Sequence, residues 1–220
     1  MKKLVLMAIG MAMVTCLSAQ VNKVETQLPK TILKFSPQHL IRGGLWISGE
    51  FFNSDYKNAH QLSLEFMYRQ PNSVGYGVTK GTGITGEYAF KHYLNRLHIE
   101  KTLGGKENIN GYYVGVFAQG GYYKEQSRYY DYGSSFPAQT TEKTNEVTTT
   151  AVYPGFIIGR QQSLGESFFV DFYVGAGMRV SESKVKTPDA NFDYKQSPDA
   201  YFLYHSGLLP KIGMSIGFGF

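Results

Sequence analysis

Apolar and polar residues alternate along most of the chain, and this period of two recurs in eight segments. In HQLSLEFMYRQ, for example, Leu62 and Leu64 alternate with Ser63 and Glu65. Such alternation is typical of β-strands that have one apolar and one polar face. The eight predicted strands have the approximate bounds 30–37, 41–52, 60–70, 81–93, 109–123, 146–160, 167–182 and 207–220.

The polar faces of these segments carry charges, hydroxyl groups and glycines, whereas the apolar faces are uninterrupted. In SFFVDFYVGAGMRV, Phe172 and Val174 share the apolar face, and Asp171 and Arg179 lie on the other. A membrane barrel turns its apolar face to lipid and fills its lumen with the polar face. We therefore predict an all-β fold, an eight-stranded antiparallel up-and-down transmembrane β-barrel. A soluble lipocalin-like barrel, with its apolar face inside, is the alternative fold.

The N-terminal residues follow a different pattern. Lys2 and Lys3 precede the short apolar run LVLMAIGMAMV, which ends in CLSAQ. This is typical of a secretory signal peptide with cleavage after Ala19. The predicted organisation is therefore a signal peptide over 1–19 and one outer-membrane barrel domain over 20–220. Cys16 is the only cysteine and would leave with the signal, so neither a disulfide nor a Cys-ligated metal is expected.

Composition narrows the classes of partner. Without Lys2 and Lys3 the basic side chains exceed the acidic ones by only a few, and no Lys/Arg cluster stands out. This balance argues against nucleic-acid binding. The chain is rich in glycine, tyrosine and phenylalanine. No later apolar run is long enough for a membrane-spanning helix.

Charged residues on the polar faces are the main candidates for a functional site. The lumen of an eight-stranded barrel is just wide enough for side chains to fill it. Charges buried there are costly unless they pair, so a plug of salt bridges is expected. The alternatives are an ion or proton path, or paired carboxylates that act as acid and base. The predicted lumen charges are Lys34, Glu50, Glu65, Arg69, Glu87, Lys91, Asp171, Arg179 and Lys211.

The two longest polar stretches, about 124–145 and 183–206, are predicted to be extracellular loops. Outer-membrane barrels have short periplasmic turns and longer extracellular loops. The first stretch is rich in Tyr, Ser and Thr, residues that make adaptable binding surfaces. These loops are therefore expected either to bind an extracellular ligand or to shield the barrel mouth against lipopolysaccharide. Aromatic residues near strand ends should form interfacial girdles, and the candidates are Phe51, Tyr68, Tyr93, Tyr122 and Phe220.

No motif for a metal or a cofactor is present. The five histidines lack metal-ligand spacing, so no metal and no cofactor are expected. His205 and Ser206 are the residue types that lipid A deacylases use on a late strand, but here they are adjacent and Gly207 follows. Adjacent residues on a strand point to opposite faces. A lipid-modifying enzyme of this kind remains an alternative, as does a narrow pore or small-ligand carrier.

Several stretches carry a resemblance to a known family: LSAQ at the end of the signal, SGEFF, TGEYAFKHYL, and the final LPKIGMSIGFGF. With them the chain resembles small outer-membrane β-barrel proteins of Bacteroidota, and its architecture is similar to the OmpA/OmpX type. The resemblance implies that the barrel-assembly machinery recognises Ile216, Phe218 and Phe220. It also implies an outer-membrane location in contact with lipid and lipopolysaccharide. We expect a non-enzymatic protein with a filled polar lumen and a structural or surface-interaction role.

Overall fold

The computed structural model describes residues 29–41, 43–69, 77–94, 98–101, 107–132, 140–164, 167–186 and 205–220. The predicted signal peptide, residues 1–19, lies outside these ranges. The elements are β1 (Thr31–Phe35), α2 (Gln38–Ile41), β2 (Gly44–Phe52), β3 (Asn58–Arg69), β4 (Gly77–Tyr93), β5 (His98–Lys101), β6 (Glu107–Tyr132), β7 (Thr140–Ser163), β8 (Phe168–Lys186) and β9 (Gly207–Gly219).

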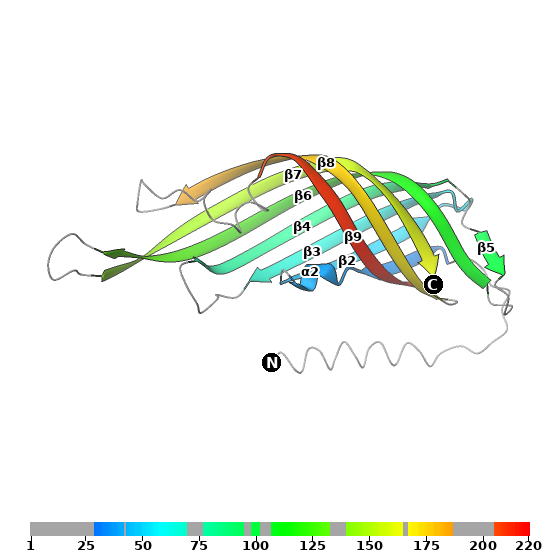
Figure 1. Ribbon diagram of the computed structural model, residues 1–220, viewed down its shortest axis with the longest axis horizontal. Helices are drawn as coiled ribbons and strands as arrows, with labels where there is room; N and C mark the ends of the chain where they lie inside the picture. Colours follow the sequence, from blue (N-terminus) through cyan, green and yellow to red (C-terminus); the bar gives the residue numbers. More distant parts are fainter. Residues whose placement is uncertain are drawn as a thin grey trace, which may run out of the picture.

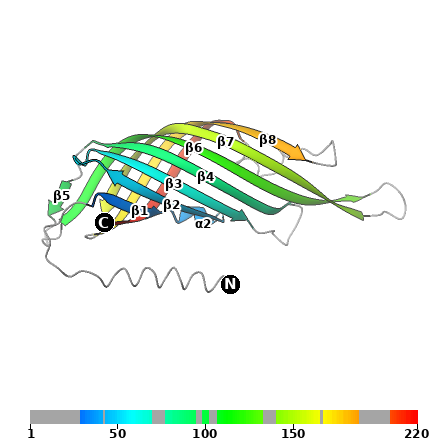
Figure 2. The same ribbon diagram turned by 180° about the vertical axis from the view of Figure 1, so that it is seen from behind.

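The strands form one closed antiparallel sheet. Their order is β4-β3-β2-β1-β9-β8-β7-β6-β5, and a further pairing of β4 with β6 closes the ring. β5 pairs only with the start of β6, in line with β4, so the barrel itself has eight strands. The predicted fold, an eight-stranded antiparallel barrel, is confirmed (Figures 1 and 2). Closure gives most strands a neighbour on both sides, whereas β9 pairs with β1 only over Ile216–Gly219.

The two ends of the barrel differ, and we name them the base and the rim. At the base, β1 begins opposite the end of β9, and short turns join β2 to β3 and β7 to β8. At the rim, β6 and β7 continue well past β1 and β2 as a twisted two-stranded ribbon (Figure 1). Beyond the last partners in β4 and β8, residues 129–132 and 140–145 pair only with each other.

The apolar residues of the alternating pattern lie on the outside. On β8, which lies between β7 and β9, Phe172 and Val174 are each more than half exposed, whereas the side chain of Asp171 is buried. The same split holds on β3, where Leu64 is exposed and Ser63 is buried. A soluble lipocalin-like barrel needs the opposite arrangement, so that alternative fold is wrong. An exposed apolar belt with a polar interior is the arrangement of a membrane barrel.

The predicted extracellular loop over 124–145 is wrong in most of its length. Residues 124–132 continue β6, residues 140–145 begin β7, and only 133–139 lie outside the described residues. The residues of these stretches do not alternate between apolar and polar types, so a period of two did not predict strands there. They remain strand because Thr and Tyr, which favour extended backbone, are frequent in them. Of the second predicted loop, 183–186 belongs to β8 and 187–204 lies outside the described residues.

No helix in the described ranges is both long enough and apolar enough to cross a membrane.

Candidate functional site

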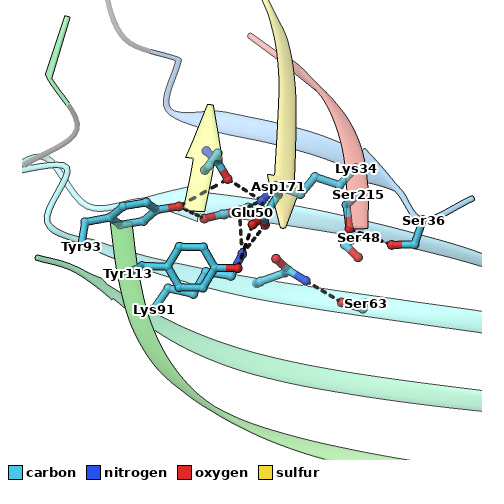
Figure 3. A network of polar contacts seen from close by, with 12 residues as sticks. Lys34, Ser36, Ser48, Glu50, Ser63, Lys91, Tyr93, Tyr113, Asp171 and Ser215 are labelled. Carbon is cyan, nitrogen blue, oxygen red and sulfur yellow. Dashed lines mark hydrogen bonds and ion pairs between the residues drawn. The ribbon is translucent and has the colours of Figure 1, made fainter. Parts of the chain in front are cut away.

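Two lysines and two carboxylates meet in the lumen near the base. Lys34 comes from β1, Glu50 from β2, Lys91 from β4 and Asp171 from β8. Each occupies an inward position of its strand, and none of the four side chains is more than 2% exposed. We call these four residues the base cluster (Figure 3). Its formal charges cancel, as burial of ions requires.

The base cluster is held by bridging contacts. Asp171 Oδ2 accepts from Lys34 Nζ at 2.6 Å and from Lys91 Nζ at 2.9 Å. Glu50 forms ion pairs with both lysines, at 3.2 Å to Lys91 Nζ. Each ion therefore touches both ions of opposite sign. Strands far apart in the sequence, β1, β2, β4 and β8, are tied together across the lumen.

Two tyrosines complete the shell of the base cluster. The Tyr93 hydroxyl donates to Glu50 Oε1 at 2.7 Å, and the Tyr113 hydroxyl donates to Asp171 Oδ1 at 2.8 Å (Figure 3). The Lys91 Nζ also lies 4.5 Å from the centre of the Tyr113 ring. A Cβ atom at Gly159 would collide with that ring, so glycine there makes room for it. Each carboxylate thus has a neutral donor besides its lysines, which lowers the cost of burial.

Gln161 and an apolar layer fill the remaining space at the base. Gln161 Oε1 accepts from Lys34 Nζ at 2.5 Å and lies 3.3 Å from the Tyr93 hydroxyl oxygen, whose hydrogen is directed to Glu50. Ile32, Phe52 and Phe169 are buried one inward position nearer to the base on the strands of Lys34, Glu50 and Asp171. The ions are therefore covered on the base side by packed hydrocarbon.

Nearer the rim the lumen holds a second, looser arrangement. Lys211 on β9 pairs with Glu87 on β4, and its Nζ lies 4.1 Å from the centre of the Phe117 ring. The ring centres of Trp46 and Tyr153 lie at 5.7 and 5.9 Å from the same atom. The Lys211 side chain thus sits among three aromatic rings with one carboxylate partner. This arrangement combines an ion pair with cation–π contacts.

The short helix α2 contributes a side chain to the rim end of the lumen. His39 Nδ1 lies 2.6 Å from Glu65 Oε1, and its ring stacks on Trp46 with centroids 4.6 Å apart. Trp46 itself donates from Nε1 to Ser48 Oγ at 3.0 Å. The connection between β1 and β2 is therefore anchored to inward-facing residues of β2 and β3.

Seven of the nine predicted lumen charges belong to these groups. Lys34, Glu50, Lys91 and Asp171 come together at the base, Glu87 and Lys211 pair nearer the rim, and Glu65 meets His39. Arg179 is buried, with its guanidinium carbon 5.9 Å from the centre of the Tyr153 ring. Arg69 is the last residue of β3, and its side chain lies outside the described part of the chain.

Sequence reasoning missed Tyr93, Tyr113 and Gln161, and it placed Tyr93 wrongly. Tyr93 was predicted to lie in an interfacial girdle, but its side chain is buried beside Glu50. The signal was present, because Tyr93 shares the strand parity of Lys91, which was placed inside. The other girdle candidates are exposed on the outer surface: Phe51, Tyr68, Tyr122 and Phe220.

The candidate groups for catalysis are the carboxylates of the base cluster and Ser206 at the rim. Among the described residues there is no cluster of three His, Cys, Asp or Glu side chains that could hold a metal ion. The carboxylates of the base cluster are bound by lysines and tyrosines and have almost no exposed surface. At the rim, Ser206 Oγ lies 3.0 Å from Ser181 Oγ and accepts from the Ser181 amide at 3.0 Å.

The proposed assembly residues lie at the base. Ile216 and Phe218 belong to β9, and the backbone amide of Phe220 donates to the Thr31 carbonyl at 3.0 Å. The rings of Phe218 and Phe220 pack edge to face with centroids 5.6 Å apart, and Phe220 is largely exposed. An aromatic pair therefore marks the outer surface where the first and last strands meet.

Comparison with known proteins adds little beyond the architecture. No model of a protein family matches the chain, and no curated protein matches it. Among solved structures, the crystal structure of Acinetobacter baumannii CarO is similar over 90% of this chain and 100% of that chain. The sequence identity is 9% and the TM-score is 0.40.

Proposed function

We propose that the chain is an integral outer-membrane barrel that is not an enzyme and does not conduct. Its role is structural or lies in surface interaction through the β6–β7 ribbon and the segment 187–204. Its expected partners are outer-membrane lipid, lipopolysaccharide, the barrel-assembly machinery and an extracellular ligand, but no nucleic acid. Membrane insertion is supported by the exposed apolar belt, in which Leu64, Phe172 and Val174 face outward.

The base cluster is the observation that supports a closed lumen. A conducting path would have to pass the side chains of Lys34, Glu50, Lys91 and Asp171, which are bound to one another and almost fully buried. Below them the apolar layer of Ile32, Phe52 and Phe169 offers no polar partner to an ion. An ion entering this layer would lose its hydration without compensation.

Planar-bilayer recording tests the closed lumen directly. The refolded protein is expected to give no discrete openings. A fourfold variant, Lys34→Ala, Glu50→Ala, Lys91→Ala and Asp171→Ala, removes the base cluster and serves as the matched control. Openings in that variant alone would support the closure by these residues, whereas discrete openings of the unmodified protein would overturn the proposal.

The absence of enzymatic activity has a separate test. Hydrolysis of a lipid ester needs a nucleophile beside a base that can take its proton, and the described contacts of Ser206 lead to Ser181. Mass spectrometry of lipid A from cells with and without the protein is expected to give the same profile. A difference that disappears in Ser206→Ala would favour the lipid-modifying alternative.

A further inference from the structure

The barrel wall is incomplete on one side towards the rim. β1 pairs with β9 only from Ile32 opposite Gly219 to Phe35 opposite Ile216. From Gly207 to Ser215, β9 is paired with β8 on one side. On its other side, no strand among the described residues continues the wall. The neighbouring strand β2 begins at Gly44, so the space between β2 and β9 above Phe35 is not bridged by a ladder.

Two prolines explain why the ladder stops. The Ser36 amide still donates to the Trp46 carbonyl at 3.2 Å, but Pro37 has no amide hydrogen and α2 begins at the next residue. On β9, Pro210 faces the missing strand. The Phe220 amide donates towards β1 and the Gly219 amide towards β8. The backbone groups of even-numbered residues of β9 therefore point to the β1 side, which we call the seam. The seam is thus closed to strand extension from both sides.

The open edge lies within the apolar belt. Leu208 and Ile212 are 74% and 76% exposed, whereas their β8 partners Met178 and Val174 are 57% and 55% exposed. The difference arises because β9 has lost the neighbour that would cover its flank. In lipid, backbone amide and carbonyl groups without partners are costly. This edge therefore needs an occupant that is apolar but also hydrogen-bonds.

The unpaired edge of β9 has exposed apolar residues on its outer side and aromatic residues of the lumen on its inner side. On the inner side, the Tyr153 hydroxyl donates to the Leu209 carbonyl at 2.9 Å, and Trp46 is buried on the facing strand. On the outer side, α2 exposes Leu40 and Ile41. Both figures of the whole molecule show α2 beside β2 rather than beside the start of β9 (Figures 1 and 2). Trp46 is only 4% exposed, because the ring of His39 on α2 stacks on it, so access to Trp46 from the belt depends on the position of α2.

We propose that the unpaired edge of β9, on the side where α2 follows β1, is a lateral binding site for the acyl chain of an outer-leaflet lipid. The chain lies against Leu208, Ile212 and Leu40, and the polar linkage of the lipid accepts from the amides of Ile212 and Met214, which have no ladder partner on this side among the described residues. A β-strand of another protein fits less well, because Pro210 has no amide hydrogen to donate to a ladder on this side. The proposal rests on the proposed insertion into the membrane.

The helix α2 forms the movable side of this site. His39 of α2 contacts Glu65 and stacks on Trp46, and just before α2 the Ser36 Oγ lies 2.7 Å from Ser215 Oγ. None of these contacts is a ladder bond, so α2 can shift without breaking the barrel sheet. Loss of the His39–Glu65 contact should therefore widen the site.

Trp46 is the only tryptophan of the chain, which provides a direct probe. The protein is refolded into vesicles of phosphatidylcholine brominated near the head-group end of one acyl chain. The loss of tryptophan fluorescence is measured relative to unbrominated vesicles. Two variants without Trp46 give the limits. Trp46→Phe with Ile47→Trp places the probe on the outer face beside the native position. Trp46→Phe with Phe117→Trp places it inside, behind a wall that is paired on both sides.

If an acyl chain binds at this edge of β9, the loss of Trp46 fluorescence will be closer to the value for Ile47→Trp than to that for Phe117→Trp. Glu65→Gln should increase the loss further, because α2 is then held less firmly. A loss no larger than that of Phe117→Trp would overturn the inference and leave the proposed function untouched. If Ile47→Trp itself is not quenched, the proposed membrane insertion fails instead.

Discussion

The base and the rim of the lumen both bury charged side chains, but they do so in different ways. At the base, Lys34, Glu50, Lys91 and Asp171 form a closed set in which every ion touches both ions of opposite charge. Nearer the rim, Lys211 has one described carboxylate partner, Glu87, and is otherwise surrounded by aromatic rings. Side-chain exposure is 2% or less in the base cluster and reaches 11% at Lys211.

The free-energy cost of removing the partner of a buried charge depends on whether that charge can reach water. An ion of the base cluster that loses a partner has no route to water, because packed hydrocarbon covers the base side. Lys211 lies closer to the open end, where a long aliphatic stem allows its ammonium group to shift. We therefore expect single substitutions to be more damaging at the base.

The largest effect is expected for Asp171→Asn. It leaves two buried lysines with one carboxylate, and an uncompensated buried charge of this kind costs about 3–5 kcal/mol. Urea unfolding in lipid vesicles, followed by the loss of heat-modifiable migration, measures the change in free energy of unfolding. The double variant Asp171→Asn, Lys91→Met restores neutrality and should recover part of the loss. A fully stable single variant would show that the base cluster is not a tightly coupled set.

A similar but smaller loss is expected when a charge is placed on the outside at mid-height. Val174→Arg puts a guanidinium in the apolar belt and should cost about 2–4 kcal/mol if the position lies near the bilayer midplane. The same unfolding titration provides the measurement, and Val174→Leu is the matched control. Equal stability of the two variants would contradict the assignment of this face to lipid.

At the rim, Lys211→Met should cost about 1–3 kcal/mol, because Glu87 is left without its ammonium partner. Adding Glu87→Gln should remove most of that penalty, since an amide needs no counter-charge. The comparison between base and rim is sharpest when Lys211→Met and Asp171→Asn are measured in the same lipid. A larger loss for Lys211→Met would reverse the ranking of the two regions.

The smallest effect is expected beyond the belt, on the ribbon. Glu146 Oε2 accepts from Lys124 Nζ at 2.8 Å, and this hydrogen bond holds the pKa of the Glu146 carboxyl below its ordinary value. The folded pKa is lowered, so the contribution is present at neutral pH and is lost as pH falls through the folded value. Lys124→Met should move the pKa of Glu146 upward in an NMR titration. An unchanged pKa would show that the pair does not persist in solution.

The alternation along the chain was sufficient to predict the barrel, its strand number and the outward face that carries Leu64, Phe172 and Val174. It failed where alternation ends but strand propensity continues, as in 124–132 and 140–145 of the ribbon. Alternation of apolar and polar residues indicates a strand with one face in lipid. Strands that pair in water need no apolar face, so alternation does not detect them. The first strand was predicted to extend over 30–37, whereas β1 ends at Phe35, two residues before Pro37.

The site was only partly predictable for a related reason. Strand parity identifies which residues face the lumen, and it placed Glu50 and Asp171 there. The pairing of Lys34 and Lys91 with both acids depends on the stagger of eight strands around the ring, which parity does not specify. Tyr93 was misplaced because aromatic residues near strand ends suit both a girdle and an interior hydrogen bond.

The short seam between β1 and β9 has a mechanical consequence. Only Ile32–Phe35 and Ile216–Gly219 join these two strands, whereas β6 and β7 are joined from Asn110 to Tyr132. Strands in a ring separate first where the fewest bonds resist shear. Under load, or during removal from the bilayer, the ring should open at this seam and peel outward from β1. The last strands to part would be those of the ribbon.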